Sequence, residues 1–168
     1  MSDVTGPLRE EHAALGPRIE QLRAVADSVG EAPRLTLRRG VEKVYDFLLH
    51  RFLPHALAEE QVLYPTVGKF LGTPYATATM SCDHTEISRL ARQLASLREQ
   101  ITDSDLDAEK ANDLRRLLYS LYGVIKAHLA KEEEVYFPLL DSHLNETQAH
   151  ELFHKIDQVT RSLGGATS

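Results

Sequence analysis

The chain has 168 residues, of which 42% are hydrophobic and 26% are charged, and its formal net charge is −6. This length and composition suit one globular domain with a buried core and exclude a largely disordered chain. The acidic balance, without a conspicuous Lys/Arg cluster, argues against nucleic acid as a partner. The N-terminus lacks a signal-peptide pattern and no stretch of about 18 apolar residues exists, so we expect no membrane partner. The single cysteine, Cys82, cannot form an internal disulfide, and a soluble cytoplasmic protein is expected.

Apolar residues recur at helical spacing throughout the chain, and no run alternates with the period of a β-strand. The spacing predicts a first helix over about residues 7–29, since Pro7 suits the first turn of a helix. A second helix is expected over about residues 34–64. Pro54 should kink this second helix and Pro65 should end it, because proline supplies no backbone N–H and crowds the preceding turn.

The second half of the chain repeats this plan. Thr73 and Pro74 predict the start of a third helix, as N-cap and first-turn residues. The polar stretch 102–107 breaks the chain, and its aspartates can cap a fourth helix that runs to about Phe137 and ends at Pro138. Two long helices are therefore expected in each half.

A fifth, shorter helix is expected to begin at Asn145 and to stop near Gly164. Gln148 follows Asn145 at the spacing of a capping box, in which each side chain bonds the backbone of the other residue. The inward stripes of the second and fourth long helices are predicted to continue through Val62 and Val135.

Four long helices joined by short links predict an all-α fold, an antiparallel up-down-up-down four-helix bundle with a short additional C-terminal helix. His12 and His55 are 43 residues apart, and His84 and His128 are 44 residues apart. Each pair has a turn near its midpoint, the second one near Asp105. Antiparallel helices would therefore place all four histidines at one level of the bundle interior.

A duplicated segment is the most informative feature of the chain. Residues 55–65 read HALAEEQVLYP and residues 128–138 read HLAKEEEVYFP, with His, Glu, Glu, Val and Pro in register. Each copy therefore contains HxxxE and follows a single upstream histidine. Positions i and i+4 lie on one helix face, so an imidazole and a carboxylate there can chelate one ion, or the carboxylate can bridge two ions.

This pattern predicts a two-metal site with shared bridges. His12 and His55 are assigned to one ion, His84 and His128 to the other, and Glu59 and Glu132 to the bridges. Imidazole with carboxylate suits Fe, Mn, Zn or Co. Two inward-facing glutamates would be costly to bury without cations.

The H-HxxxE-H-HxxxE arrangement, with its EEQVLYP and EEEVYFP tails, resembles the hemerythrin-like (HHE cation-binding) family over about residues 8–140. The resemblance implies one hemerythrin-like domain over residues 1–168, with the bundle at about 7–140 and the C-terminal helix at about 145–163. It also implies a non-haem centre of two iron ions joined by an oxo or hydroxo bridge.

The chain departs from the oxygen-carrying hemerythrins at two positions. Their third helix carries HxxxH, whereas His84 is followed at i+4 by Ser88; their fourth carries HxxxxD, whereas His128 is followed by Glu132. With one imidazole fewer, the resemblance implies an open position for water, peroxide or another ligand rather than reversible oxygen carriage. Relatives with the doubled pattern are linked to peroxide breakdown, to nitric oxide or oxygen response, or to iron sensing.

We therefore expect a reaction with a small oxidant (H2O2, O2 or NO), with catalase-like decomposition of hydrogen peroxide as the first choice. Two alternatives stay open. One is a module that binds or senses O2, NO or iron without turnover, and the other is a structural zinc site that closes the bundle.

Tyr64 corresponds to Phe137 in the second copy. On an ideal helix Tyr64 points away from His55, so we expect an aromatic plug at the bundle end with its hydroxyl in water. The alternative is an additional metal ligand, if a bend before Pro65 turns the phenol inward. Cys82 is expected to be a small packing residue, with a redox-sensitive thiol as its alternative.

Two further features take a subordinate place. Glu60 and Glu133 are expected to bind water or arginine around the site rather than metal. His150 and His154 lie in an HExxH motif, which is typical of zinc peptidases. A peptidase also needs a third ligand and a cleft, so a terminal helix packed on the bundle is favoured.

Overall fold

The computed structural model describes residues 4–101 and 106–164, and every regular element within them is helical. In chain order the α-helices are α1 Gly6–Ser28, α2 Arg34–Phe47, α3 Leu53–Ala58, α4 Tyr64–Leu71, α5 Ala78–Gln100, α6 Ala108–Lys131, α7 Phe137–His143 and α8 Glu146–Gly164. A 3-10 turn, Pro74–Thr77, precedes α5, and π-helical turns lie at Leu48–Phe52, Glu59–Leu63 and Glu132–Tyr136. The all-α prediction is confirmed; the turn predicted near Asp105 lies outside the described residues.

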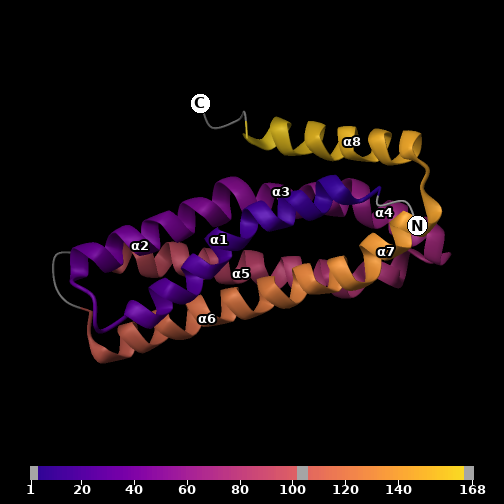
Figure 1. The fold of residues 1–168 in the computed structure, drawn as a ribbon. Helices are drawn as coiled ribbons and strands as arrows, with labels where there is room; N and C mark the ends of the chain where they lie inside the picture. The colour runs from indigo at the N-terminus through magenta and orange to yellow at the C-terminus, as the bar shows by residue number, and fades with distance from the viewer. Residues whose placement is uncertain (1–3, 102–105, 165–168) are drawn as a thin grey trace.

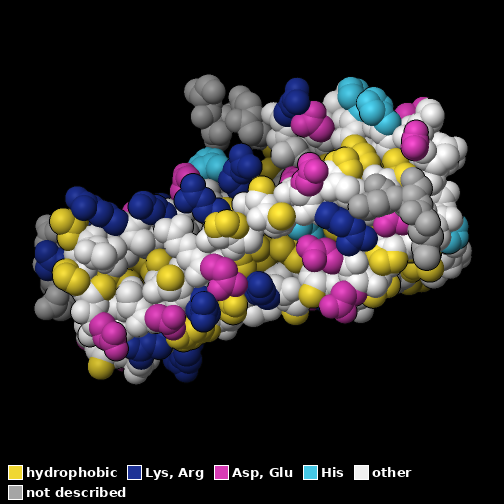
Figure 2. All heavy atoms as spheres, in the orientation of Figure 1, with side chains coloured by type: hydrophobic (Ala, Val, Ile, Leu, Met, Phe, Trp, Pro, Cys, Tyr) yellow, Lys and Arg dark blue, Asp and Glu magenta, His cyan; other side chains and the backbone are white. Residues whose placement is uncertain are grey.

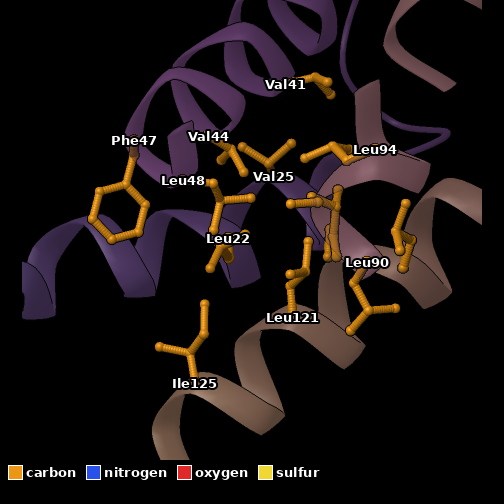
Figure 3. Close-up of a cluster of buried hydrophobic side chains, with 14 of the residues drawn as sticks. Leu22, Val25, Val41, Val44, Phe47, Leu48, Leu90, Leu94, Leu121 and Ile125 are labelled. Atoms are coloured by element: carbon orange, nitrogen blue, oxygen red, sulfur yellow. The ribbon is translucent and has the colours of Figure 1, made fainter. Parts of the chain in front are cut away.

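The long helices pack side by side (Figure 1), and their buried hydrophobic side chains form two clusters. α1 packs against α2 and α6, and α5 packs against the same two helices. One residue from each of these helices, Leu22, Val44, Leu94 and Leu121, meets the others in a cluster rich in leucine and valine (Figure 3). Burying each such side chain contributes about 1.5–3 kcal/mol, so this cluster is a main source of stability.

Side-chain caps begin three of the helical segments where the sequence predicts them. The Thr73 hydroxyl accepts a hydrogen bond from the Tyr75 N–H at 3.2 Å, and the Asp107 carboxylate accepts one from the Lys110 N–H at 2.8 Å. Before α8, Asn145 and Gln148 exchange bonds of 2.9 and 3.1 Å, which form the expected capping box.

Each of the three π-helical turns is followed, two residues after its end, by a proline. In the turn before Pro65, the Tyr64 N–H bonds to the Glu59 carbonyl, five residues back. This wider spacing relieves the clash between the proline ring and the carbonyl four residues earlier. The prediction that Pro65 and Pro138 end their helices is therefore wrong, because α4 continues to Leu71 and α7 to His143.

The π-helical turns also shift which residues face inward. Each turn holds one residue more than an α-helical turn, so the buried stripe moves forward by one position. Leu63 and Tyr136 are buried, whereas Val62 is half-buried and Val135 is 56% exposed. The predicted inward orientation is wrong for Val135 for this reason, whereas Val62 still packs, partly buried, against a hydrophobic cluster that contains Leu63 and Tyr64.

α8 lies along α3 and the π-helical turn Glu59–Leu63 (Figure 1). Its buried side chains are Ala149, Leu152 and Ile156, spaced by three and four residues on one face. Across residues 4–101 and 106–164, none of the helices combines the length and apolar character that a membrane span requires.

The shifted register predicts different costs for two alanine substitutions in the metal-free protein. Leu63→Ala should lower the free energy of unfolding by about 2–5 kcal/mol, because it leaves a cavity in the core. Val135→Ala should change it by less than about 0.5 kcal/mol, because Val135 is exposed. Urea denaturation followed by circular dichroism measures both, and a large loss for Val135→Ala would contradict the shifted register.

Candidate metal centre

The six predicted ligands converge at one buried place. The histidines come from four elements, His12 from α1, His55 from α3, His84 from α5 and His128 from α6. Glu59 and Glu132 are the first residues of two π-helical turns. None of the six is more than 6% exposed. Their ligand atoms form two groups within 4.8 Å, one of His12, His55, Glu59 and Glu132, the other of Glu59, His84 and His128.

Glu59 belongs to both groups. Its Oε1 lies 2.8 Å from His55 Nε2 and 3.9 Å from His12 Nε2. Its Oε2 lies 3.3 Å from His84 Nε2 and 3.8 Å from His128 Nε2. One carboxylate thus presents an oxygen to each histidine pair, which is the arrangement that a bridging ligand requires.

Glu132 also reaches both halves, but less evenly. Its Oε2 is 3.4 Å from His12 Nε2, and its Oε1 is 3.8 Å from His128 Nε2. Oε1 also accepts a hydrogen bond of 2.8 Å from the Tyr64 hydroxyl. One oxygen of Glu132 is therefore already engaged, whereas both oxygens of Glu59 face imidazoles.

Four buried polar atoms have no hydrogen-bond partner among the described residues: His12 Nε2, His55 Nε2, Glu59 Oε2 and Glu132 Oε2. Leaving a buried polar atom unsatisfied costs about 1–3 kcal/mol, so native proteins rarely do so. All four atoms are imidazole nitrogens or carboxylate oxygens, which are common ligand atoms for divalent transition metals. The residues present therefore fit a metal ion.

The other ring nitrogen of each histidine is held by a second carboxylate. The Nδ1 atoms of His12, His55, His84 and His128 lie 3.0, 3.1, 2.9 and 3.2 Å from Glu133, Glu11, Glu60 and Asp83, respectively. We call Glu11, Glu60, Asp83 and Glu133 the outer carboxylates. A carboxylate that accepts from Nδ1–H fixes the ring and leaves the Nε2 lone pair for a metal.

The outer carboxylates follow the duplication. Glu11 and Asp83 each precede the single histidine of their half and hold the HxxxE histidine of the same half. Glu60 and Glu133 each follow the inner glutamate and hold the single histidine of the opposite half. We expected Glu60 and Glu133 to bind water or arginine, but each contacts a histidine instead. The roles of Glu11 and Asp83 were missed, although an acidic residue before each single histidine was the available signal.

Tyr64 points into the site rather than to water. It is 3% exposed, and its hydroxyl lies 3.5 Å from His84 Nε2 and 3.4 Å from His128 Nε2. Its ring stacks on His84, with centroids 5.5 Å apart and planes 14° apart. The expected plug with a hydroxyl in water is wrong, because the π-helical turn Glu59–Leu63 advances Tyr64 toward the site.

The remaining candidates lie away from this centre. Cys82 is exposed on α5, so its predicted packing role is wrong. His150 and His154 are exposed on α8, and histidine side chains are visible over that helix (Figure 2). The candidate metal groups found in residues 4–101 and 106–164 do not include His150 or His154, so the peptidase alternative gains no support.

The imidazoles and carboxylates of the site shift one another's pKa values. Burial lowers the pKa of His12, but the nearby carboxylates of Glu132 and Glu59 outweigh burial and raise that pKa to about 9. Burial also opposes ionisation of Glu59, yet the charge of His55 and contacts with neighbouring imidazoles hold its pKa well below the usual value. Burial, reinforced by the charge on Glu59, raises the pKa of Glu132. The two inner carboxylates thus differ, and Glu59 is the more strongly ionised.

A buried histidine–glutamate cluster held by packed helices defines a cation-binding helical protein. Comparison with protein families identifies it further: the family model described as the hemerythrin HHE cation binding domain matches residues 4–140, and a second match covers residues 78–166. The chain belongs to this family. The overlapping second match is what a duplicated helix pair would produce. Neither the curated proteins nor the solved structures contain a match to the chain.

The outer carboxylates predict a loss of metal affinity when one is neutralised. Glu11→Gln weakens the acceptor for His55 Nδ1 and should lower the apparent metal affinity about 10–100-fold. The adjacent Glu10 is exposed, so Glu10→Gln is the matched control and should change the affinity little. Competition with a chromogenic chelator measures both variants, and equal affinities would contradict a supporting role for Glu11.

The protonated state predicts the pH dependence of metal binding. Metal ions compete with protons for imidazole nitrogen, and the pKa of His12 is raised to about 9. Binding at pH 7 should therefore release protons, and the apparent affinity should increase as the pH rises toward that value. Calorimetric titration in two buffers with different ionisation enthalpies counts the released protons. A binding enthalpy that is independent of the buffer would contradict this prediction.

Proposed function

We propose that this chain is a single hemerythrin-like domain, an antiparallel up-down-up-down four-helix bundle that binds two iron ions. The ligands would be His12, His55, Glu59, His84, His128 and Glu132, with the two glutamates as bridges. The main observation in support is the position of Glu59, whose two oxygens face the Nε2 atoms of different histidine pairs. The orphaned polar atoms and the family match support the same proposal.

We further propose that Tyr64 serves the half of the centre that contains His84 and His128. That half has three grouped ligands, whereas the other has four. The Tyr64 hydroxyl lies within 3.5 Å of both histidine Nε2 atoms, so it is placed to supply an additional ligand. This would compensate for Ser88, which stands where oxygen carriers have a histidine.

The proposed reaction is the catalase-like decomposition of hydrogen peroxide. Two iron ions held here would supply and take back the two electrons by which one peroxide is reduced to water and a second is oxidised to dioxygen. The side chains would orient peroxide and hold its protons. The Tyr64 hydroxyl, which donates to Glu132 at 2.8 Å, is placed to exchange a proton with a molecule bound beside it.

A binding or sensing module for O2, NO or iron, without turnover, is the second candidate. The observation that favours it is the enclosure of the site, since all six ligands and Tyr64 are buried. An enclosed site retains a bound ligand and slows its exchange. Turnover distinguishes the two candidates.

The bridging role of Glu59 predicts the metal content of two variants. Wild-type protein loaded anaerobically with ferrous iron should contain two ions per chain. Glu59→Ala should lose both ions, because each histidine pair faces an oxygen of Glu59. His12→Ala should lose mainly one ion. Elemental analysis decides, and a full pair of ions in Glu59→Ala would exclude the bridge.

The proposed reaction predicts oxygen evolution from hydrogen peroxide above that of an equal amount of free iron. Tyr64→Phe removes only the hydroxyl, so it should keep the fold, lower the rate and abolish any tyrosinate-to-iron absorption band. An oxygen electrode and visible spectroscopy measure these effects. A stable oxygen or nitric oxide adduct without peroxide turnover would contradict the catalase-like reaction and support a binding or sensing module.

A further inference from the structure

A cavity of about 540 Å³ lies beside the candidate metal centre, between α4, the 3-10 turn Pro74–Thr77 and α5. Its lining on the side of the metal centre includes Tyr64 and Glu60. Its other lining residues include Pro65, Gly68, Thr73, Thr77 and Ser81.

One layer of side chains separates this cavity from the site. Tyr64 lines the cavity, while its hydroxyl contacts Glu132 and the Nε2 atoms of His84 and His128. Glu60 also lines the cavity and contacts His84 Nδ1 at 2.9 Å. A molecule in the cavity would therefore touch the residues that touch the proposed ligands.

A second cavity reaches the opposite half of the site less directly. It has a volume of about 230 Å³ and lies between α1 and α8, where its lining includes Glu11, Phe153 and Thr160. Glu11 contacts only the outer nitrogen of His55, at 3.1 Å. No residue that contacts a histidine Nε2 atom is in the lining described for this cavity. The larger cavity is therefore the shorter path.

The wall of the larger cavity favours an uncharged visitor. Proline, glycine, threonine and the tyrosine ring make up most of its lining. Both oxygens of Glu60 already have partners, Ser81 Oγ at 2.8 Å and His84 Nδ1 at 2.9 Å. Lys69 belongs to the lining but is exposed to solvent. Small neutral molecules can enter a cavity with such a lining at little desolvation cost, whereas an ion would have to lose a strongly bound hydration shell.

We propose that this cavity is the access route by which a small uncharged oxidant reaches the half of the centre formed by His84 and His128, and that Tyr64 is the side chain such a molecule must pass. Tyr136 positions this gate: its ring packs edge-on against Tyr64 at 6.2 Å, and its hydroxyl donates to the Ala76 carbonyl in the 3-10 turn. The inference rests on the proposed function, because it presumes metal in the site.

Nitric oxide, which is small and uncharged, is the probe. Its association with the iron-loaded, reduced protein is followed by stopped-flow absorbance, a readout independent of turnover. Ser81→Phe places a ring in the larger cavity and narrows it, and Ser81→Ala removes the same hydrogen bond to Glu60 without narrowing the cavity. Ser81→Phe should bind nitric oxide several-fold more slowly than Ser81→Ala. Thr160→Phe, which fills the smaller cavity, should match the wild type.

Iron content and thermal unfolding establish that each variant is folded and loaded. If Ser81→Phe does not load two irons, Ser81→Leu repeats the comparison with a smaller side chain. Equal rates for the filled variant and Ser81→Ala would overturn the access route while leaving the proposed function intact. Slowing by Thr160→Phe alone would move the route to the cavity beside α8. A wild-type protein that binds no iron pair would overturn the proposed function and the route together.

Discussion

The structure depends on the burial of two carboxylates among four imidazoles. Without a cation this arrangement leaves four orphaned polar atoms in the core, and each carries an unfavourable desolvation cost. The helices must therefore hold these groups against their own electrostatic preference. The leucine-rich cluster of α1, α2, α5 and α6 supplies that restraint, since it packs these helices against one another. The outer carboxylates then fix each imidazole, so the donor atoms are oriented before any ion arrives.

Local pattern was sufficient to predict the helical class, three of the caps and the six residues that meet at the candidate centre, but not where the second and fourth helices end. Helical spacing decides which residues share a face, so a His and a Glu at positions i and i+4 are expected to be neighbours. The outer carboxylates are different, because Glu11 and Asp83 act across helices. Nothing in the spacing within one helix reveals which imidazole an acidic residue on a neighbouring helix will meet.

The π-helical turns account for the errors at Val135, at Tyr64 and at the two prolines. Moving one backbone hydrogen bond from the fourth to the fifth preceding residue leaves composition and hydrophobic spacing unchanged, yet it rotates everything downstream. This change of register explains why Val135 is exposed and why Tyr64 is buried in the site, contrary to the prediction. Pro65 and Pro138, which were predicted to end the helices, instead follow the π-helical turns within helices that continue. A proline shortly after an HxxxE segment is therefore compatible with a helix that continues.

The π-helical turns Glu59–Leu63 and Glu132–Tyr136 correspond in the two halves, but the aromatic residues that follow the same inner glutamates, Tyr64 and Phe137, differ by one hydroxyl. Phe137 packs against His12 with ring centroids 5.0 Å apart, as Tyr64 packs against His84 in the opposite half. The two aromatic rings occupy equivalent positions in the two halves, but only Tyr64 carries a hydroxyl. In a duplicated site of this kind, replacing a single phenyl ring by a phenol is enough to make the two halves chemically different. Division of labour between the halves would then require no change of fold.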